Sequence, residues 1–131
     1  MFTHIKTSAG NKLIVSDLTR KFNLGTENLI ARIAFSYSLK SGVRFDPLDV
    51  KDSGGKEYSK SVLFGNYYPI YLSMICTHYK VDSYNKDIPR FIKMHVDDGL
   101  ELINKEVIEN PNLIGFDYLI DKIENGLNEI C

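Results

Sequence analysis

The sequence lacks tryptophan and is poor in cysteine and proline, with two cysteines and four prolines in 131 residues. A transmembrane helix needs roughly 20 consecutive apolar residues, and no stretch of the chain provides them. The first ten residues lack the apolar core of a secretory signal peptide. Cys76 and Cys131 have no partner motif, so no structural disulfide is expected. These absences predict a cytoplasmic protein that does not associate with membranes.

Catalytic and metal-binding patterns are missing as well. His4, His78 and His95 lack the closely spaced His or Cys neighbours of a zinc site. The chain has no glycine-rich phosphate loop, nucleophile elbow or C-x-x-C pair. We therefore expect a protein without catalytic residues, metal or cofactor, which is not an enzyme.

The composition that is present is that of one globular domain, with 44% apolar and 25% charged residues, and we expect residues 1–131 to form a single unit. The net charge is only −1, but it is unevenly distributed. Residues 1–60 carry ten Lys/Arg and six Asp/Glu (net +4), whereas residues 61–131 carry six and eleven (net −5). An anionic partner is therefore expected to meet the first half of the chain.

The N-terminal third of the sequence predicts a strand followed by two helices. Residues 2–7 favour a short strand, although their alternation is imperfect. Ser8 is a candidate cap for a first helix over 9–23. A second helix follows, capped by Thr26 and ended by Gly42.

This order over residues 1–42 matches half of a ribbon-helix-helix module. In such a module two chains pair their strands, and the N-terminus of the second helix meets a phosphate. In the alternative, the two helices simply pack within an all-α bundle and the strand has no role. The pattern leaves both open.

The rest of the chain, residues 67–131, is expected to be helical. It follows a long loop over 43–66, which is charged, shows no sustained period and has room for one turn of helix. Helices are predicted at 69–80, 89–109 and 116–130. The first of these is apolar nearly all round, which indicates a place in the core or at a subunit interface.

Gly99 lies in the middle of one predicted helix, where glycine costs about 1 kcal/mol relative to alanine. We therefore expect another backbone to approach closely there. The expected fold class is mainly α, with about five helices and a short N-terminal strand.

Seven cationic residues are candidate DNA contacts, because a phosphate backbone requires suitably placed positive charge and no fixed motif. Arg32 has a competing role, since it borders the apolar stripe of the second helix. It is expected to pair with Asp17 or Glu27, or else to contact a phosphate or another subunit. The seven candidates are Lys6, Lys12, Arg20, Lys21, Arg32, Lys40 and Arg44.

Three blocks of the chain resemble the DndE family of DNA sulfur modification (phosphorothioation) proteins. The block LGTENLIARIAFSYSL at 24–39 is similar to a family block with a turn, then Asn, Arg-Ile-Ala and Ser-Leu. LFGNYYPIYLSMICTHY at 63–79 and IKMHVDDGLELI at 92–103 are similar in order and spacing. The resemblance covers about residues 2–107.

The resemblance implies a helical bacterial protein that binds duplex or nicked DNA as a homotetramer. It also implies that the protein acts together with the other DNA sulfur-modification proteins, which replace a non-bridging phosphate oxygen by sulfur. Basic side chains, chiefly lysines, make the family's DNA contacts through the backbone. Lysine positions have no motif to match, so the seven candidates above depend on charge alone.

Two other functions compete with DNA binding. One is a protein-interaction scaffold of the sulfur-modification complex with little direct DNA contact. The other is a small enzyme that acts at a DNA end or nick. Salt-dependent DNA affinity separates the DNA-binding subunit from the scaffold.

Overall fold

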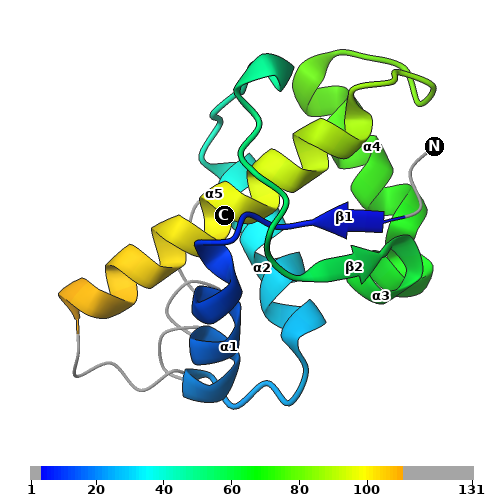
Figure 1. Cartoon of the computed structure of the whole chain (residues 1–131). Helices are drawn as coiled ribbons and strands as arrows, with labels where there is room; N and C mark the ends of the chain where they lie inside the picture. The colour runs from blue at the N-terminus through cyan, green and yellow to red at the C-terminus, as the bar shows by residue number, and fades with distance from the viewer. Residues whose placement is uncertain (1–3, 111–131) are drawn as a thin grey trace, which may run out of the picture.

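The computed structural model describes residues 4–110, and Figure 1 shows their arrangement. They form a mainly helical fold with one short antiparallel sheet, which confirms the predicted fold class. The helix predicted over 116–130 lies outside the described residues. No helix in the described part is long and apolar enough to cross a membrane. In chain order the elements are β1 (His4–Lys6), α1 (Asn11–Lys21), α2 (Glu27–Lys40), the 3-10 turn η1 (Pro47–Asp49), β2 (Glu57–Ser59), α3 (Lys60–Phe64), the 3-10 turn η2 (Gly65–Tyr67), α4 (Tyr68–Tyr79) and α5 (Ile88–Glu109).

The predicted order of strand, helix and helix is confirmed at the N-terminus. As expected, α2 begins after Thr26, although the Thr26 side chain makes no capping hydrogen bond. Gly42 beyond the end of the helix takes the positive φ (82°) that helix ends favour. The first helix differs from the prediction, because α1 begins at Asn11 and Ser8 does not cap it. The backbone N–H of Ser8 instead donates to Asp97 Oδ1 at 3.0 Å.

β1 pairs with β2 of the same chain, and not with a strand of a second chain as in a ribbon-helix-helix module. The central pair of the sheet is Ile5 opposite Tyr58, and both side chains are buried. Lys6 lies opposite Glu57 at the end of the ladder. The strand therefore helps to close the core of its own chain.

The segment 43–66 is not the continuous loop that the sequence predicted. It contains β2 and α3, and Leu63 and Phe64 of α3 are fully buried. The ring centroid of Phe64 lies 5.0 Å from that of Phe35 and 4.6 Å from that of Tyr71. The short helix α3 fits the one turn of helix that the sequence allowed, whereas β2 was not predicted, because a three-residue strand is too short to show a hydrophobic period.

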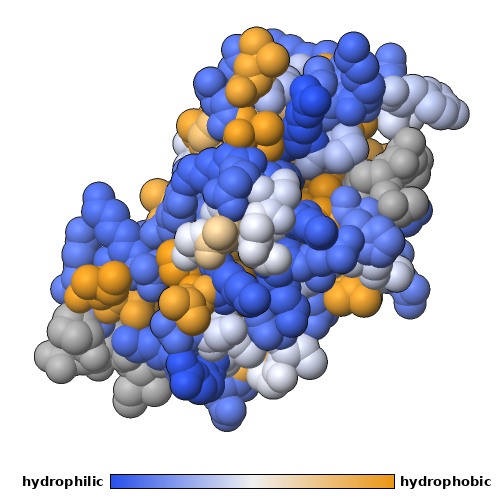
Figure 2. Space-filling view, viewed as in Figure 1, coloured by the Kyte–Doolittle hydropathy of each residue, from blue (hydrophilic) through white to orange (hydrophobic). Residues whose placement is uncertain are grey.

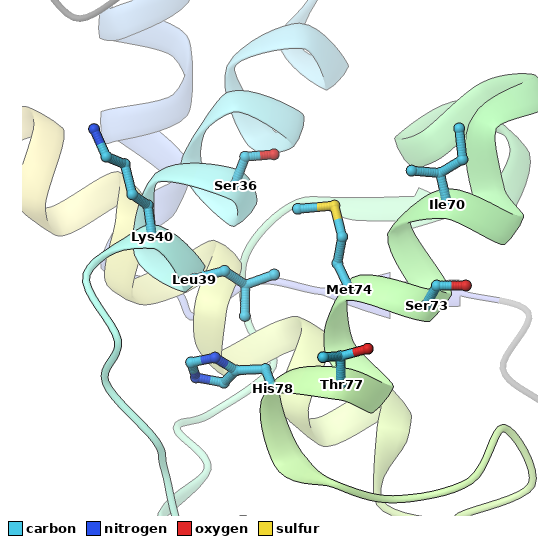
Figure 3. A pocket seen from close by; sticks show the side chains of 8 residues that line it. All are labelled: Ser36, Leu39, Lys40, Ile70, Ser73, Met74, Thr77 and His78. Carbon is cyan, nitrogen blue, oxygen red and sulfur yellow. The ribbon is translucent and has the colours of Figure 1, made fainter. Parts of the chain in front are cut away.

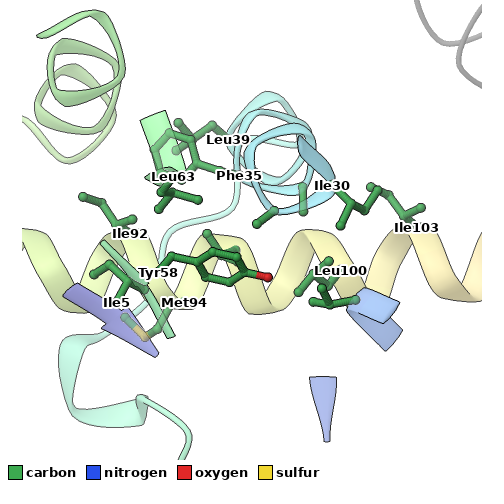
Figure 4. Close-up of a cluster of buried hydrophobic side chains, with 14 of the residues drawn as sticks. Ile5, Ile30, Phe35, Leu39, Tyr58, Leu63, Ile92, Met94, Leu100 and Ile103 are labelled. Atoms are coloured by element: carbon green, nitrogen blue, oxygen red, sulfur yellow. The ribbon is translucent and has the colours of Figure 1, made fainter. Parts of the chain in front are cut away.

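The core is centred where α2 packs against α5, and Figure 4 shows apolar side chains gathered between these helices. Ile30 of α2 and Leu100 and Ile103 of α5 are almost completely buried there. The close approach predicted at Gly99 is confirmed, since an added Cβ would lie 1.9 Å from the carbonyl oxygen of Ala34. Glycine therefore sets the distance between the two helices.

α4 lies at the edge of this core. Its sequence is apolar nearly all round, yet Ile75 is its only fully buried residue and Ile70 is 58% exposed. Of the two places that the sequence allowed, the centre of the core is therefore excluded for the single chain, and a subunit interface stays open. An apolar helix face is left on the surface, which is the usual mark of an interaction site.

A buried ion pair attaches the N-terminal segment to α5. Lys93 Nζ donates to Asp97 Oδ2 at 3.1 Å, and the two side chains are 8% and 3% exposed. The same ammonium donates to the backbone carbonyls of Lys6 (2.6 Å) and Asp52 (2.8 Å). Buried charges are tolerated when they are paired and hydrogen-bonded in this way. The network fixes the start of α1 and so the direction in which that helix faces solvent.

Candidate nucleic-acid interface

The surface of α1 carries three cations, one acid and one exposed apolar residue, Leu13. The helical period turns Val15 and Leu18 into the core, where both are buried. Lys12, Arg20 and Lys21 lie on the remaining surface and are all exposed. Figure 2 shows hydrophilic surface with an apolar patch beside it over this part of the molecule. Three of the seven predicted cations therefore lie on one helix, with Lys12 and Lys21 on its two flanks, because nine residues turn an α-helix by about 180°.

Asp17 is the one acidic residue in α1, and it pairs with Arg20. Both side chains are well exposed, and such surface pairs contribute little to stability. Arg20 can therefore exchange this partner for another anion at small cost. Lys12 and Lys21 make no ion pair with any of the described residues. The helix surface accordingly retains uncompensated positive charge.

The N-terminus of α2 does not offer the open phosphate site considered from the sequence. Glu27 lies in its first turn, where a carboxylate interacts favourably with the helix dipole. This carboxylate also faces Lys56 Nζ at 3.5 Å. An incoming phosphate would therefore be repelled at this position, and the α1 cations are the better candidates.

Lys6 lies on β1 with its side chain exposed, just before the start of α1. Its cross-strand neighbour is Glu57, which is also exposed. Opposite charges at facing positions of an antiparallel pair attract one another. Lys6 is thus near the α1 surface but partly neutralised.

Arg32 has a structural role that the sequence did not suggest. Its Nε donates to the carbonyl oxygen of Leu63 at 2.7 Å, and its Nη2 reaches that of Val62 at 3.4 Å. These are carbonyls of α3, whose short length leaves its last acceptors unpaired. Arg32 therefore joins α2 to α3 and pairs with neither Asp17 nor Glu27. This contact with the end of α3 explains the arginine in the block at 24–39, which resembles the family.

Lys40 and Arg44 lie at a different place, beside the C-terminal ends of α2 and α4. Lys40 lines a hollow between these two helices. Arg44 Nε donates to the carbonyl oxygen of His78 at 3.0 Å, near the end of α4. Figure 1 shows α1 and α4 on opposite sides of the fold, so these two cations are separate from the α1 group.

A buried polar chain crosses the core next to this region. Ser38 Oγ donates to Asp98 Oδ2 (2.6 Å), so His95 Nδ1, at 2.8 Å, is the donor to that hydroxyl. His95 Nε2 then accepts the hydroxyl proton of Tyr79 at 2.6 Å. Burial, with a smaller contribution from the nearby His78, lowers the pKa of His95 to about 4. The chain links α2, α4 and α5 around a neutral imidazole.

Sequence reasoning missed this chain, although Ser38 and His95 stand as isolated polar residues within apolar helix stripes. Such residues are buried only when their hydrogen bonds are satisfied. The arrangement does not activate the serine for nucleophilic attack, because its single proton is directed at the Asp98 carboxylate and not at the imidazole. The contacts fit a structural role.

The described residues define a small helical protein with a two-stranded sheet and a cationic outer helix. Comparison with protein-family models matches residues 4–110 to the family described as DNA sulphur modification protein DndE. The chain belongs to this family, which is involved in DNA phosphorothioation. The resemblance seen in the three sequence blocks is thereby confirmed.

Two solved structures are similar in fold. The crystal structure of DndE from Escherichia coli B7A, involved in DNA phosphorothioation modification, is 21% identical with a TM-score of 0.62. The crystal structure of a DndE G21/24K mutant involved in DNA phosphorothioation is 23% identical with a TM-score of 0.65. Each match covers 79% of this chain and 98% of the other. A comparison with curated proteins gave no significant match.

Proposed function

We propose that the chain is a non-catalytic DNA-binding subunit of a DNA phosphorothioation system, and that it binds duplex or nicked DNA through the phosphate backbone. The observation that carries this proposal is the set of exposed cations along α1. Lys12 and Lys21 are exposed there without an ion-pair partner among the described residues, and Arg20 is held only by a surface pair. Family membership supplies DNA as the polyanion.

The contact is proposed to be independent of base sequence. Lysine side chains act as flexible point charges, which suits phosphate oxygens more than the fixed donor pattern of a base edge. Such binding releases counterions, so the logarithm of the affinity falls with the logarithm of salt concentration, by about 0.9 per phosphate neutralised on duplex DNA. Contacts of this kind require neither a bend nor a free end in the DNA.

The test compares two double variants that change the net charge equally. Lys12→Glu with Lys21→Glu reverses the α1 surface, and Lys80→Glu with Lys86→Glu is the control at the connection between α4 and α5. Fluorescence anisotropy with intact and nicked duplexes is measured at several salt concentrations. We expect the α1 variant to lose more than about tenfold in affinity and to show a salt slope smaller by about two. Equal losses in both variants would remove the α1 assignment.

The proposal includes self-association into a homo-oligomer, with a tetramer as the expected size. Sedimentation velocity on the full chain measures this directly. Several copies would place several α1 surfaces on one particle, which raises affinity for a long polyanion through multivalency. A monomer at the concentrations used for DNA binding would contradict this part of the proposal.

A scaffold for other DNA sulfur-modification proteins is the second candidate function. The apolar surface of α4 favours it, because exposed apolar helix faces mark protein contacts. The two functions use different surfaces of the chain and do not exclude each other. A protein that shows no DNA affinity even at low salt would be a scaffold alone.

A further inference from the structure

One of the three buried residues of α1 is polar. Asn11, Val15 and Leu18 form the buried row of this helix, and Asn11 is only 1% exposed. The Nδ2 group of Asn11 donates to Asp97 Oδ1 at 2.8 Å and to Ser8 Oγ at 3.1 Å. A hydrogen bond to a carboxylate is stronger than one between neutral groups. Asn11 is therefore held against α5 by a directional contact.

We infer that Asn11 is a positioning residue, which fixes the rotation of α1 about its own axis and so keeps both Lys12 and Lys21 on the surface that meets DNA. The inference rests on the DNA-binding function proposed above and names the residue that orients the contact. Asn11 does not touch DNA itself, because its side chain is buried against Asp97.

Apolar packing alone leaves the rotation of α1 poorly specified. Hydrophobic burial is non-directional, and two further apolar residues lie beside the buried row. Ile14 is only partly buried, and Leu13 is 74% exposed. Three residues advance an α-helix by about 300°, so Ile14 lies about 60° from Asn11 around the helix. A turn of this size would place Ile14 against the core and move Asn11 outward.

The buried polar contact opposes that turn. The carboxylate of Asp97 is buried, and its Oδ2 accepts from Lys93. Its Oδ1 accepts from the backbone N–H of Ser8 and from the side chain of Asn11. A turn of α1 would remove one of the donors on which this buried carboxylate depends. A buried asparagine among apolar residues fixes helix register in coiled coils in the same way.

Stability alone would not select an asparagine at this position. Asn11 Oδ1 is buried and has no hydrogen-bond partner among the described residues. A buried unpaired acceptor costs free energy, and an apolar side chain of similar shape avoids that cost. The N–H of Ser8 would still donate to Asp97 Oδ1 if Asn11 were replaced. The asparagine therefore contributes more to orientation than to stability.

The rotation of α1 decides which of its cations face solvent. Lys12 and Lys21 lie on the two flanks of the helix, so both reach the surface only when the buried row faces the core. Seven residues make nearly two full turns, so Lys21 lies on the same side of the helix as Ile14. A turn that brings Ile14 inward therefore carries Lys21 toward the core. Lys40 is unaffected, because it lies in the hollow between α2 and α4 that Figure 3 shows.

Asn11→Leu removes the directional contact and keeps a side chain of similar size. We expect the free energy of unfolding in urea to be equal to or above that of the wild type. Affinity for duplex DNA should nevertheless fall at least about fivefold, with a salt slope smaller by about one for the lost phosphate contact. Asn104→Leu is the matched control, because it makes the same substitution at a partly buried position of α5. Stability and affinity that fall together would indicate a purely structural role and overturn the inference.

A second measurement follows the rotation of α1 without DNA. The chain has no tryptophan, so Leu13→Trp introduces a single fluorescent reporter at an exposed position of α1. Adding Asn11→Leu is expected to shift its emission to shorter wavelength and to reduce its quenching by acrylamide, because the turn moves position 13 toward the core. Adding Asn104→Leu should leave the reporter exposed. Unchanged emission in the Asn11→Leu background would contradict the proposed rotation.

The two measurements separate this inference from the proposed function. A wild-type chain without DNA affinity would refute the DNA-binding function, and with it the part of Asn11 in DNA contact. A wild-type chain that binds DNA no more tightly than Asn11→Leu would refute only the role assigned to Asn11. Shifted emission together with reduced affinity and undiminished stability is the result that supports it.

Discussion

The Cα of Gly99 in α5 lies so close to Ala34 in α2 that a methyl group added to it would approach the Ala34 carbonyl oxygen to 1.9 Å. The obstacle is backbone, which cannot rotate away as a side chain could. The contact lies at the centre of the α2 and α5 packing that forms the core.

Gly99→Ala is therefore expected to destabilise the protein, although alanine normally favours a helix interior by about 1 kcal/mol over glycine. The helices must separate to admit the methyl group, and overpacking of this kind costs typically about 1–3 kcal/mol. Urea unfolding measures the difference. Gly10→Ala is the control, because nothing lies within 4 Å of its added Cβ. A Gly99→Ala protein as stable as the wild type would contradict the close packing.

Asp17→Asn is expected to strengthen DNA binding. The substitution removes the only acid of α1 and releases Arg20 from its ion pair. We expect affinity to rise by a few fold at low salt, with the gain disappearing as salt screens the charges. Asp82→Asn changes the net charge equally at an exposed position between α4 and α5 and serves as the control. An equal gain in both variants would indicate an effect of net charge and not of the α1 surface.

Arg32→Ala is expected to lower stability and leave DNA affinity almost unchanged. The guanidinium is engaged by the carbonyl oxygens of Leu63 and Val62, and removal leaves these acceptors without their partner. Hydrogen bonds to charged groups contribute about 1.5–3 kcal/mol each, so a loss of this order is expected in urea unfolding. Arg32→Lys should recover little, because a lysine cannot reproduce the fork. A large loss of DNA affinity in a stable variant would restore Arg32 as a phosphate contact.

Stability is expected to decrease as the pH is lowered, because of His95. Its pKa is about 4 in the folded protein, below the ordinary value of 6.5, since burial disfavours the imidazolium. The unfolded chain therefore binds a proton that the folded one does not as pH falls through 6.5. This contribution to stability is complete above pH 6.5 and is lost between pH 6.5 and 4, by at most about 3 kcal/mol.

Urea unfolding at a series of pH values measures this slope, and His95→Gln should flatten it within that window. Glutamine keeps a donor and an acceptor near Ser38 and Tyr79, so the variant is expected to fold. His4→Gln is the control, because His4 is exposed. An unchanged slope in His95→Gln would mean that another group titrates.

Long helices with a clear period could be read from the sequence, and short or tertiary features could not. Thr26 and Gly42 marked the bounds of α2, because residue preferences at helix ends and positive φ are local properties. β2 was missed and α3 was expected only as one turn of helix without a position, since elements of three and five residues have no period to detect. The cations of the candidate site could be listed from the sequence. Which of them lie on α1 and which lie near the end of α2 depends on how the helices cross.

The amino-acid sequence by itself determined the mainly helical class, the family and the excess of positive charge in the first half, because composition, caps and periodic apolar stripes act locally. Only the tertiary structure decided that Arg32 serves α3, that α4 faces outward, and that Lys12 and Lys21 lie on a different surface from Lys40. These outcomes depend on which helix faces meet in the core. That choice is made by packing between residues far apart in the chain, such as the backbone contact between Gly99 and Ala34.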